Sequence, residues 1–474
     1  MPGAGEGPGG AAGLVARRDL AVRAAVAQGL IGPDRPVIGL LDVAGIRAAA
    51  RALHAAFDRV TAPGTPVLHT FAVKAAALVP VVRLFAEEAL GCEVASPGEL
   101  AVARAAGVGP EHTVLDSPAK TPAELREALA LGIAVNADNL GELARLDALV
   151  AAGGTASPLG LRVNPQVGGG TIEALSTATA TSKFGVALRD AGARDRVVRA
   201  FLDRPWLTRL HTHTGSQGVP LELMVQGVRA AYELAEEINR AAGRRQVDTL
   251  DIGGGLPVNF ASDATGPTFA DYADALRSAV PGLFDGRYGL VTEFGRSLIA
   301  KYGTVLARVE YAKEAGGRPI AVTHAGAQLA VRTVYAPGSW PLRVAAYGPD
   351  GRPKPESPLV EQDVAGPCCF AGDLLAVARP LPPLAPGDLT ALLDTGAYYF
   401  SHHFAYNSLP RPGVYGFVTG GAGGDGGNGT QSGGGGGAGG DGGVRFATVR
   451  SPQTVAEIVA ESGGAHPDAL SGLG

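Results

Sequence analysis

The chain has 474 residues, a formal net charge of −5 and three cysteines, and 46% of its residues are hydrophobic. Its length suits two or three domains with large cores, and its dispersed charge excludes a basic nucleic-acid face or a polybasic membrane anchor. We find no signal peptide at the start, and no apolar stretch reaches the roughly 18 residues of a membrane helix. Cys92, Cys368 and Cys369 lack the spacing of a disulfide framework, so we expect a cytoplasmic protein.

The first 35 residues begin with a Gly-rich stretch, and we expect residues 1–35 to be poorly ordered apart from one helix near residues 11–30. Residues 37–42 form a strand candidate that we count with the following domain; pairing with the C-terminal domain is the alternative. Residues 43–57 are Ala-rich, and their periodicity predicts a helix.

Short apolar runs then alternate with segments of helical periodicity. The predicted strands are 67–73, 92–95, 113–116, 134–136, 159–164, 207–213, 249–252 and 290–293, and the predicted helices include 98–106, 122–131, 140–152, 221–242 and 269–280. Eight strands that alternate with helices predict an α/β domain, a closed, TIM-like (β/α)8 barrel over residues 36–303. An open doubly wound sheet is the alternative.

Beyond residue 304 the pattern changes to short strands broken by Pro and Gly. These strands are 305–311, 320–324, 342–347, 374–378, 389–393, 414–418 and 444–449, and they predict a mostly antiparallel β domain over residues 304–460. Residues 420–443 are nearly all Gly, and we expect a flexible loop inside a hairpin. The tail, residues 461–474, is expected to be frayed.

Lys74 ends the first regular strand, and it is one of few lysines in a chain that carries its basic charge mostly as arginine. Its flanks are apolar, so desolvation should favour a neutral, nucleophilic amine. Such an amine is typical of a Schiff-base lysine. The alternative is a lysine whose stem covers apolar surface while its ammonium reaches water.

The active site of such a barrel lies at the carboxyl ends of its strands. Besides Lys74, these ends carry residues 95–99, 162–165, 211–217, 251–255 and 293–297. The glycine triplet at 253–255 lets backbone N–H groups approach an anion, and Ser216 and Arg296 at neighbouring ends strengthen a phosphate-site interpretation. An amine, an imidazole, a carboxylate and a phosphate cradle together meet the needs of pyridoxal phosphate.

Motifs in a characteristic order run through the chain from about residue 37 to residue 458. They lie at residues 71–74, 95–100, 162–165, 182–185, 213–217, 251–255, 293–297, 366–369, 396–398 and 406–412. Through these motifs the chain resembles the fold-type III pyridoxal-phosphate decarboxylases, which include the diaminopimelate, ornithine and arginine decarboxylases. The Ser216-Gln217 pair and residues 406–412 are most similar to the diaminopimelate branch.

The resemblance implies a homodimeric, pyridoxal-phosphate-dependent α-decarboxylase of an amino acid. Lys74 would form the imine with the cofactor, His213 would stack on its ring, and Glu293 would keep the ring nitrogen protonated. Cys369, contributed by the other subunit, would protonate the carbanion, and Arg332 lies near the family's substrate-carboxylate arginine. The other implied cofactor contacts are Arg162, Ser216, Gly253, Gly254, Gly255, Gly295, Arg296 and Tyr398, with Tyr398 also a substrate contact.

Two other functions remain open for the same fold. A racemase or epimerase would need acids on both faces of the substrate, and only Lys74 and Cys369 are candidates. A catalytically silent homologue that regulates a relative is the second alternative, although Lys74, Glu293 and Cys369 are all present.

The substrate residues depart from the family pattern. Phe370 stands where an acidic residue usually follows the cysteine, and burial of a distal ammonium against it would cost several kcal/mol. We therefore expect a substrate other than diaminopimelate, either an uncharged or apolar amino acid or a larger specialised one. Asp373 is expected near the substrate pocket or as a loop cap. Further departures are Glu93 and His324 in place of aspartate, and Phe294 in place of proline, whose ring would reshape the cofactor floor.

His211 and His213 permit a rival interpretation as a metal site, because residues two apart on a strand face the same way. No further His or Cys ends another predicted barrel strand, and a metal would leave Lys74 and the glycine triplet unused. We therefore predict no metal.

Overall fold

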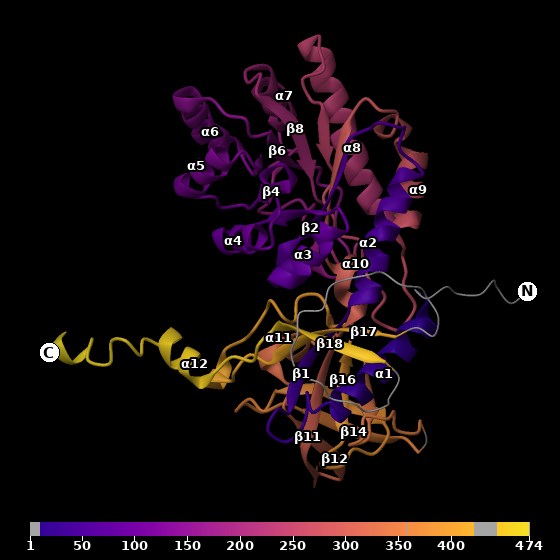
Figure 1. Ribbon diagram of the computed structural model, residues 1–474. Helices are drawn as coiled ribbons and strands as arrows, with labels where there is room; N and C mark the ends of the chain where they lie inside the picture. The colour runs from indigo at the N-terminus through magenta and orange to yellow at the C-terminus, as the bar shows by residue number, and fades with distance from the viewer. Residues whose placement is uncertain (1–9, 357, 421–442, 474) are drawn as a thin grey trace, which may run out of the picture. The chain divides into compact units, whose positions relative to one another are not determined.

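A computed structural model describes residues 10–356, 358–420 and 443–473. The chain divides into two compact units (Figure 1). The barrel unit consists of Ile46–Asn259 and Ala264–Lys301, and the β unit consists of Met1–Gly45, Phe260–Asp263 and Tyr302–Gly474. Apart from its two ends, the predicted Gly-rich loop 420–443 lies outside the described residues.

Parallel strands form the closed barrel. They are β2 (Val67–Ala72), β3 (Gly91–Val94), β4 (Thr113–Asp116), β5 (Ala134–Ala137), β6 (Leu159–Asn164), β8 (Leu207–Thr212), β9 (Thr249–Asp251) and β10 (Gly289–Phe294). They pair in the order β5-β4-β3-β2-β10-β9-β8-β6, and β5 pairs with β6 to close the ring. The short β7 (Val186–Ala187) adds to β6. The predicted (β/α)8 barrel is confirmed, and each predicted strand overlaps an observed one.

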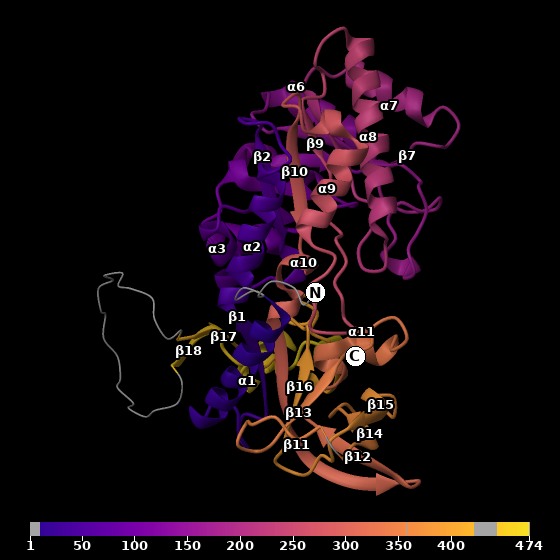
Figure 2. The same ribbon diagram turned by 90° about the vertical axis from the view of Figure 1, so that its right-hand side faces the viewer.

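Helices follow most of these strands and surround them (Figure 2). They are α2 (Val43–Asp58, in the barrel unit from Ile46 onward), α3 (Val79–Glu87), α4 (Pro97–Ala105), α5 (Pro122–Leu131), α6 (Leu140–Gly153), α7 (Ala193–Leu202), α8 (Leu221–Ala242) and α9 (Phe269–Ala279). Ser96, Thr121, Asn139 and Thr268 cap α4, α5, α6 and α9, and each side chain accepts a backbone N–H of the first turn. The caps of α4, α5 and α6 follow the ends of β3, β4 and β5 within a few residues, so these helices begin soon after their strands.

Phe294, at the end of β10, is fully buried and packs outside the strands. Its ring lies against the rings of Phe57 from α2 and of Phe269 and Tyr272 from α9. The prediction that Phe294 would reshape the cofactor floor is therefore wrong, because its side chain faces the helix layer.

The β unit contains a mostly antiparallel sheet, as predicted. Its strands are β1 (Val37–Asp42), β11 (Gly303–Ala315), β12 (Arg318–Thr323), β13 (Val344–Tyr347), β14 (Val360–Ala365), β15 (Leu374–Leu381), β16 (Leu389–Leu393), β17 (Gly413–Thr419) and β18 (Val444–Arg450). The parallel pairs are β1–β17 and β12–β14. Strand β1 therefore lies in this sheet, between β11 and β17, and not with the barrel.

Helix α1 (Ala11–Ala27) belongs to the core of the β unit. Ala21, Val22 and Ala25 are fully buried in one cluster with residues of the sheet such as Leu306 and Tyr415. The helix predicted near residues 11–30 is therefore confirmed, and its small apolar side chains pack closely on the strands. The first nine residues lie outside the described part of the chain.

The C-terminal part of the β unit carries α11 (Ala327–Tyr335) and α12 (Val455–Glu461). Thr454 and Glu457 form a capping box at the start of α12, and all residues from 461 to 473 are exposed. Fraying of the tail stays a prediction. Within the described residues, no helix is both long and apolar enough to cross a membrane.

Candidate active site

Lys74 lies in the short turn η1 (Val73–Ala75) directly after β2, at the carboxyl end of that strand. Its Nζ forms an ion pair with Oε2 of Glu93, which the pairing of β3 with β2 places beside Ala72. The Lys74 side chain is 42% exposed, whereas that of Glu93 is fully buried. The environment of Lys74 is therefore not purely apolar as predicted, because the carboxyl of Glu93 contacts its amine, and burial raises the pKa of Glu93 above its usual value.

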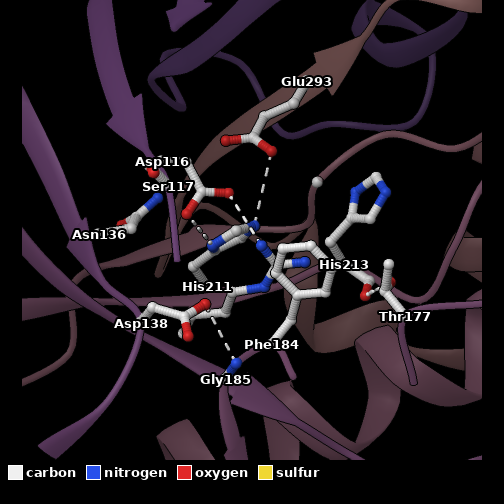
Figure 3. A network of polar contacts seen from close by, with 12 residues as sticks. Asp116, Ser117, Asn136, Asp138, Thr177, Phe184, Gly185, His211, His213 and Glu293 are labelled. Carbon is white, nitrogen blue, oxygen red and sulfur yellow. Dashed lines mark hydrogen bonds and ion pairs between the residues drawn. The ribbon is translucent and has the colours of Figure 1, made fainter. Parts of the chain in front are cut away.

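Two carboxylates approach the buried His211 inside the barrel (Figure 3). Nδ1 of His211 lies 3.6 Å from Oδ1 of Asp116, and Nε2 lies 3.5 Å from Oε2 of Glu293. Burial alone would raise the pKa of Asp116, but the charges of His211 and Arg162 outweigh burial and hold this pKa below its usual range. Asp116 is therefore an anion beneath the mouth of the barrel.

Glu293, near the end of β10, is buried and carries an unsatisfied oxygen. Within the described residues, Oε1 has no hydrogen-bond donor. Burial, together with the negative charges of Asp116 and Glu93, raises the pKa of Glu293 well above its usual value. Glu293 therefore favours its neutral form until a cationic partner, such as a protonated ring nitrogen, stabilises the carboxylate.

His213 follows β8, and Figure 3 shows its ring pointing away from His211. Its Nδ1 accepts the backbone N–H of Gly254 at 3.1 Å, so the proton of the neutral ring is on Nε2. Burial and the nearby charges of Arg162 and Lys74 lower the pKa of His213 well below its usual value. A neutral imidazole held in one orientation suits the stacking role that the sequence predicts.

The glycine triplet after β9 leaves no room for side chains. A Cβ atom would lie 2.6 Å from Nδ1 of His213 at Gly253, 2.0 Å from the carbonyl oxygen of Glu293 at Gly254, and 1.8 Å from that of Gly215 at Gly255. The N–H groups of Gly253 and Gly254 already donate to Asp251 and His213. Of the predicted triplet of phosphate donors, Gly255 is therefore the one whose N–H has no acceptor within the described residues.

The remaining predicted barrel residues differ in how they are engaged. Arg162 is buried, donates to Asp116 at 3.3 Å and stacks on Phe184, with Cζ 4.4 Å from the ring centroid. The backbone N–H of Ser216 donates to a carbonyl, which leaves its hydroxyl for a phosphate. Arg296 is buried at the start of α10 (Arg296–Ile299), directly after Gly295.

The structure changes which residues could form a metal site. Within the described residues, one group could hold an ion, and it consists of Asp116, His211 and Glu293, whose ligand atoms lie within 4.8 Å of one another. His213 is outside this group because its Nδ1 accepts the N–H of Gly254. The predicted pair of His211 and His213 is therefore not brought together around one point.

In the β unit, the structure places Arg332 beside Tyr398. Arg332 lies on α11, and its Cζ is 5.0 Å from the Tyr398 ring centroid and 5.3 Å from that of Trp340. Its Nη1 is buried and, within the described residues, has no hydrogen-bond acceptor. A buried guanidinium N–H of this kind can bind a carboxylate.

Cys369 is exposed, and its backbone N–H donates to Oδ1 of Asn407 at 2.7 Å. The neighbouring Cys368 is buried, and burial raises the pKa of its thiol to about 11. Both Asp373 oxygens accept backbone N–H groups, from Ala327 at 2.6 Å and from Cys368 at 2.7 Å. These bonds give Asp373 the predicted loop-cap role, and its substrate contact stays a prediction.

Phe370 belongs to an aromatic cluster formed with Tyr335, Phe404 and Tyr406. The Phe370 ring stacks on Tyr335 with a centroid distance of 5.5 Å and an angle of 12°, and meets Tyr406 edge-on at 5.6 Å. Phe404 and Tyr406 stack at 5.7 Å. The faces of these rings are thus largely turned toward one another.

Several residues of these clusters were not predicted as site residues, notably Asp116, Phe184 and Trp340. Asp116 ends a predicted barrel strand, so its charge at the end of an apolar run is a signal that could have identified it. Phe184 lies in a recognised motif but stacks on a residue distant in sequence. Trp340 lies in a loop and has no comparable signal.

The barrel residues fit pyridoxal phosphate, which supplies a reactive aldehyde and an electron-withdrawing ring when bound. Lys74 would hold it covalently, the unsatisfied Glu293 oxygen would meet the ring nitrogen, and neutral His213 would stack on the ring. The Gly255 N–H, the Ser216 hydroxyl and Arg296 would bind the phosphate. The glycine triplet has the close backbone packing that such a cradle requires.

Comparisons with known proteins agree with this geometry. Residues 43–300 match the family described as pyridoxal-dependent decarboxylase, pyridoxal binding domain. The diaminopimelate decarboxylase of Pseudomonas aeruginosa is 35% identical over 350 residues, which cover 73% of this chain and 80% of that protein. The diaminopimelate decarboxylase of Methanothermobacter thermautotrophicus is 32% identical over 350 residues, 72% of this chain and 78% of that protein.

Solved structures share the fold. The crystal structure of Helicobacter pylori diaminopimelate decarboxylase complexed with L-lysine aligns with a TM-score of 0.76 at 23% identity, and covers 93% of this chain and all of that one. The barrel, its glycine triplet and the family match together confirm pyridoxal phosphate as the cofactor. The chain therefore belongs to the pyridoxal-dependent decarboxylase family and is a pyridoxal-phosphate-dependent amino-acid decarboxylase.

Proposed function

We propose that this decarboxylase acts on an amino acid whose side chain carries no ammonium group, and not on diaminopimelate. The observation that carries the proposal is Phe370, which stands beside Cys369 where the family usually has an acid. Phe370 packs against Tyr335 and Tyr406, so an apolar ring occupies the position of that acid.

The aromatic cluster does not replace the missing acid. An ammonium can bind the remaining face of Phe370 or Tyr335, but such a contact is weaker than the charge-assisted hydrogen bond of an acid. A buried ammonium without a counter-ion would therefore lose several kcal/mol, on the order of its uncompensated desolvation. Each oxygen of Asp373 accepts a backbone N–H, so this carboxylate is engaged in holding its loop.

Several residues of this chain have separate roles in the proposed reaction. Lys74 would hold the cofactor through its amine, which contacts Glu93 in this structure. Glu293 would contact the ring nitrogen, and the bound cofactor would supply an electron-withdrawing ring. Cys369 returns a proton after CO2 has left. Cys369 is exposed, and we assign it to the active site of a second copy in a homodimer.

The substrate proposal is tested by CO2 release from a panel of both enantiomers of amino acids with apolar, polar, cationic and dicationic side chains, including meso-diaminopimelate. We expect apolar or uncharged members to react faster than meso-diaminopimelate, ornithine or lysine. The Phe370→Glu variant should shift the preference toward substrates with a distal ammonium, because it returns the acid. Phe370→Leu is the matched control and should keep the original preference.

Efficient turnover of meso-diaminopimelate by the unmodified enzyme would refute the substrate proposal. Inversion of an amino acid without CO2 release would contradict decarboxylation as the physiological reaction and favour the racemase alternative.

A further inference from the structure

A tetrapeptide in the chain of the barrel belongs to the β unit. The flanking segments Ile46–Asn259 and Ala264–Lys301 form the barrel unit, whereas Phe260–Asp263 is assigned to the β unit. Within the barrel unit, Nδ2 of Asn259 donates to the carbonyl oxygen of Ala264 at 3.3 Å, which ties the two ends of this excursion together. The tetrapeptide lies a few residues after the glycine triplet in sequence.

The first residue of the tetrapeptide contacts the aromatic support of Arg332. The Phe260 ring meets Trp340 edge-on, with a centroid distance of 6.4 Å and an angle of 75°. Trp340 is buried, and its ring lies 5.3 Å from Cζ of Arg332. Phe260, Trp340 and Arg332 therefore form one continuous row of contacts.

The last residue of the tetrapeptide reaches the second aromatic neighbour of Arg332 through ion pairs. Asp263 lies 3.2 Å from Nη1 of Arg18 and accepts from Nη2 of Arg343 at 3.0 Å. The same Arg343 Nη2 donates to Asp394 at 2.9 Å. Asp394 begins the turn that carries Tyr398.

This turn is held in a conformation that needs support. Asp394 has a φ of 61° and Tyr398 a φ of 66°, in the left-handed region that residues other than glycine rarely adopt. Such strain persists where surrounding contacts fix the backbone, and the pair of Arg343 with Asp394 is one of them. The Tyr398 ring that results lies 5.0 Å from Cζ of Arg332.

We propose that Phe260 and Asp263 are positioning residues for Arg332. They hold Trp340 and the Tyr398 turn, the two aromatic supports of the guanidinium, so that the buried Nη1 of Arg332 stays available to a carboxylate. That this carboxylate belongs to the substrate rests on the proposed function; the positioning itself does not.

The experiment uses the cofactor-free full-length chain and the fluorescence of Trp340. The chain has two tryptophans, so Trp206→Phe leaves Trp340 as the single reporter. The probe is glutarate, a dicarboxylate without an amine. We expect glutarate to change the Trp340 emission, and Phe260→Ala to weaken its binding about fivefold, the order of one lost aromatic or cation–π contact. Asp263→Asn should weaken it in the same direction.

Phe446→Ala is the matched control, because Phe446 makes a similar pair with Phe417 at 6.3 Å elsewhere in the β unit. It should bind glutarate as the parent does, and Phe260→Tyr should restore binding. Arg332→Met should abolish the response, and the Phe260→Ala, Arg332→Met double variant should equal Arg332→Met alone. In turnover, Phe260→Ala should raise KM for the fastest substrate of the panel about fivefold and change kcat less than about twofold.

An absent glutarate response in the parent, or unchanged glutarate binding in Phe260→Ala, would overturn the positioning role. A failure of the substrate panel alone would overturn the proposed function and leave the positioning of Arg332 intact, because the fluorescence titration needs neither cofactor nor turnover.

Discussion

Glu293 is buried, and it is also the residue predicted to contact the cofactor's ring nitrogen. Its substitution should therefore change both the free energy of unfolding and the rate of turnover. Burial, with the charges of Asp116 and Glu93, raises its pKa in the folded chain above the value of about 4.3 in an unfolded chain. The folded state therefore binds more protons than the unfolded state above this pH. Its contribution to stability is fully present below about pH 4.3 and is lost as pH rises through the higher folded-state pKa.

We expect Glu293→Gln to remove this loss, because an amide does not ionise. The free energy of unfolding of the cofactor-free variant should exceed that of the wild type at pH 8, and the gap should narrow by up to about 1.4 kcal/mol per pH unit toward pH 5. The kcat should fall at least about 100-fold, since a neutral amide does not stabilise a protonated ring nitrogen. Urea unfolding at both pH values and turnover assays measure these effects; a gap independent of pH would contradict the first.

At the residue scale, the sequence identified the position of Lys74 but not its surroundings. A lysine after an apolar run at a strand end is a local pattern, and η1 places it as expected. Its partner Glu93 was visible only as an unusual residue, because the contact between them depends on the register of β2 and β3. The link from Asp116 through His211 to Glu293 joins three strands, and no spacing in the chain encodes it.

The loop after β9 gives a prediction at the scale of one element. We expect Gly254→Ala to weaken pyridoxal-phosphate binding at least about tenfold, because its Cβ would lie 2.0 Å from the backbone oxygen of Glu293 and force the loop to move. The movement would also break the bond from Gly254 to His213. Titration of the cofactor-free chain by absorbance measures the dissociation constant. Gly153→Ala, with nothing within 4 Å of its Cβ, is the control and should bind normally.

Elements with strong periodicity were predicted, whereas helix α11 and the packing of helix α1 were not. The strands and long helices of the barrel repeat apolar residues at the expected spacing, and α5 and α8 match the predicted bounds. Helix α1 was predicted near residues 11–30, but its place in the core of the β unit was not, because that depends on contacts with strands far away in sequence. Helix α11, which carries Arg332, lies among strands where no helix was predicted.

At the scale of the whole molecule, the order of elements revealed the two-part architecture, but not the membership of each part. Strand β1 precedes the barrel in sequence and joins the sheet of the β unit, and Phe260–Asp263 leaves the barrel chain for the same unit. Both assignments depend on contacts between segments far apart in sequence. The exposed Tyr335 and Tyr406, 59% and 40% accessible beside Cys369, motivate the assignment of this face to a second copy.

Subunit mixing tests that assignment. Lys74→Ala lacks the amine and Cys369→Ala lacks the proton donor, so each variant alone should be nearly inactive. If each active site takes Lys74 from one copy and Cys369 from the other, a mixed dimer contains one complete site and one site that lacks both groups. Random exchange of subunits makes half of the dimers mixed, so activity should recover to about a quarter of the wild-type value.

The control mixes Lys74→Ala with the Lys74→Ala, Cys369→Ala double variant, which cannot form a complete site and should stay inactive. Light scattering checks that both mixtures are dimeric, so that a lack of activity cannot result from dissociated subunits. If Cys369 instead served the site of its own chain, every subunit in the mixture would lack one group, and no activity would return. A dimeric mixture without recovery would therefore place Cys369 in the site of its own subunit, whereas full activity of Cys369→Ala alone would place it outside the chemistry.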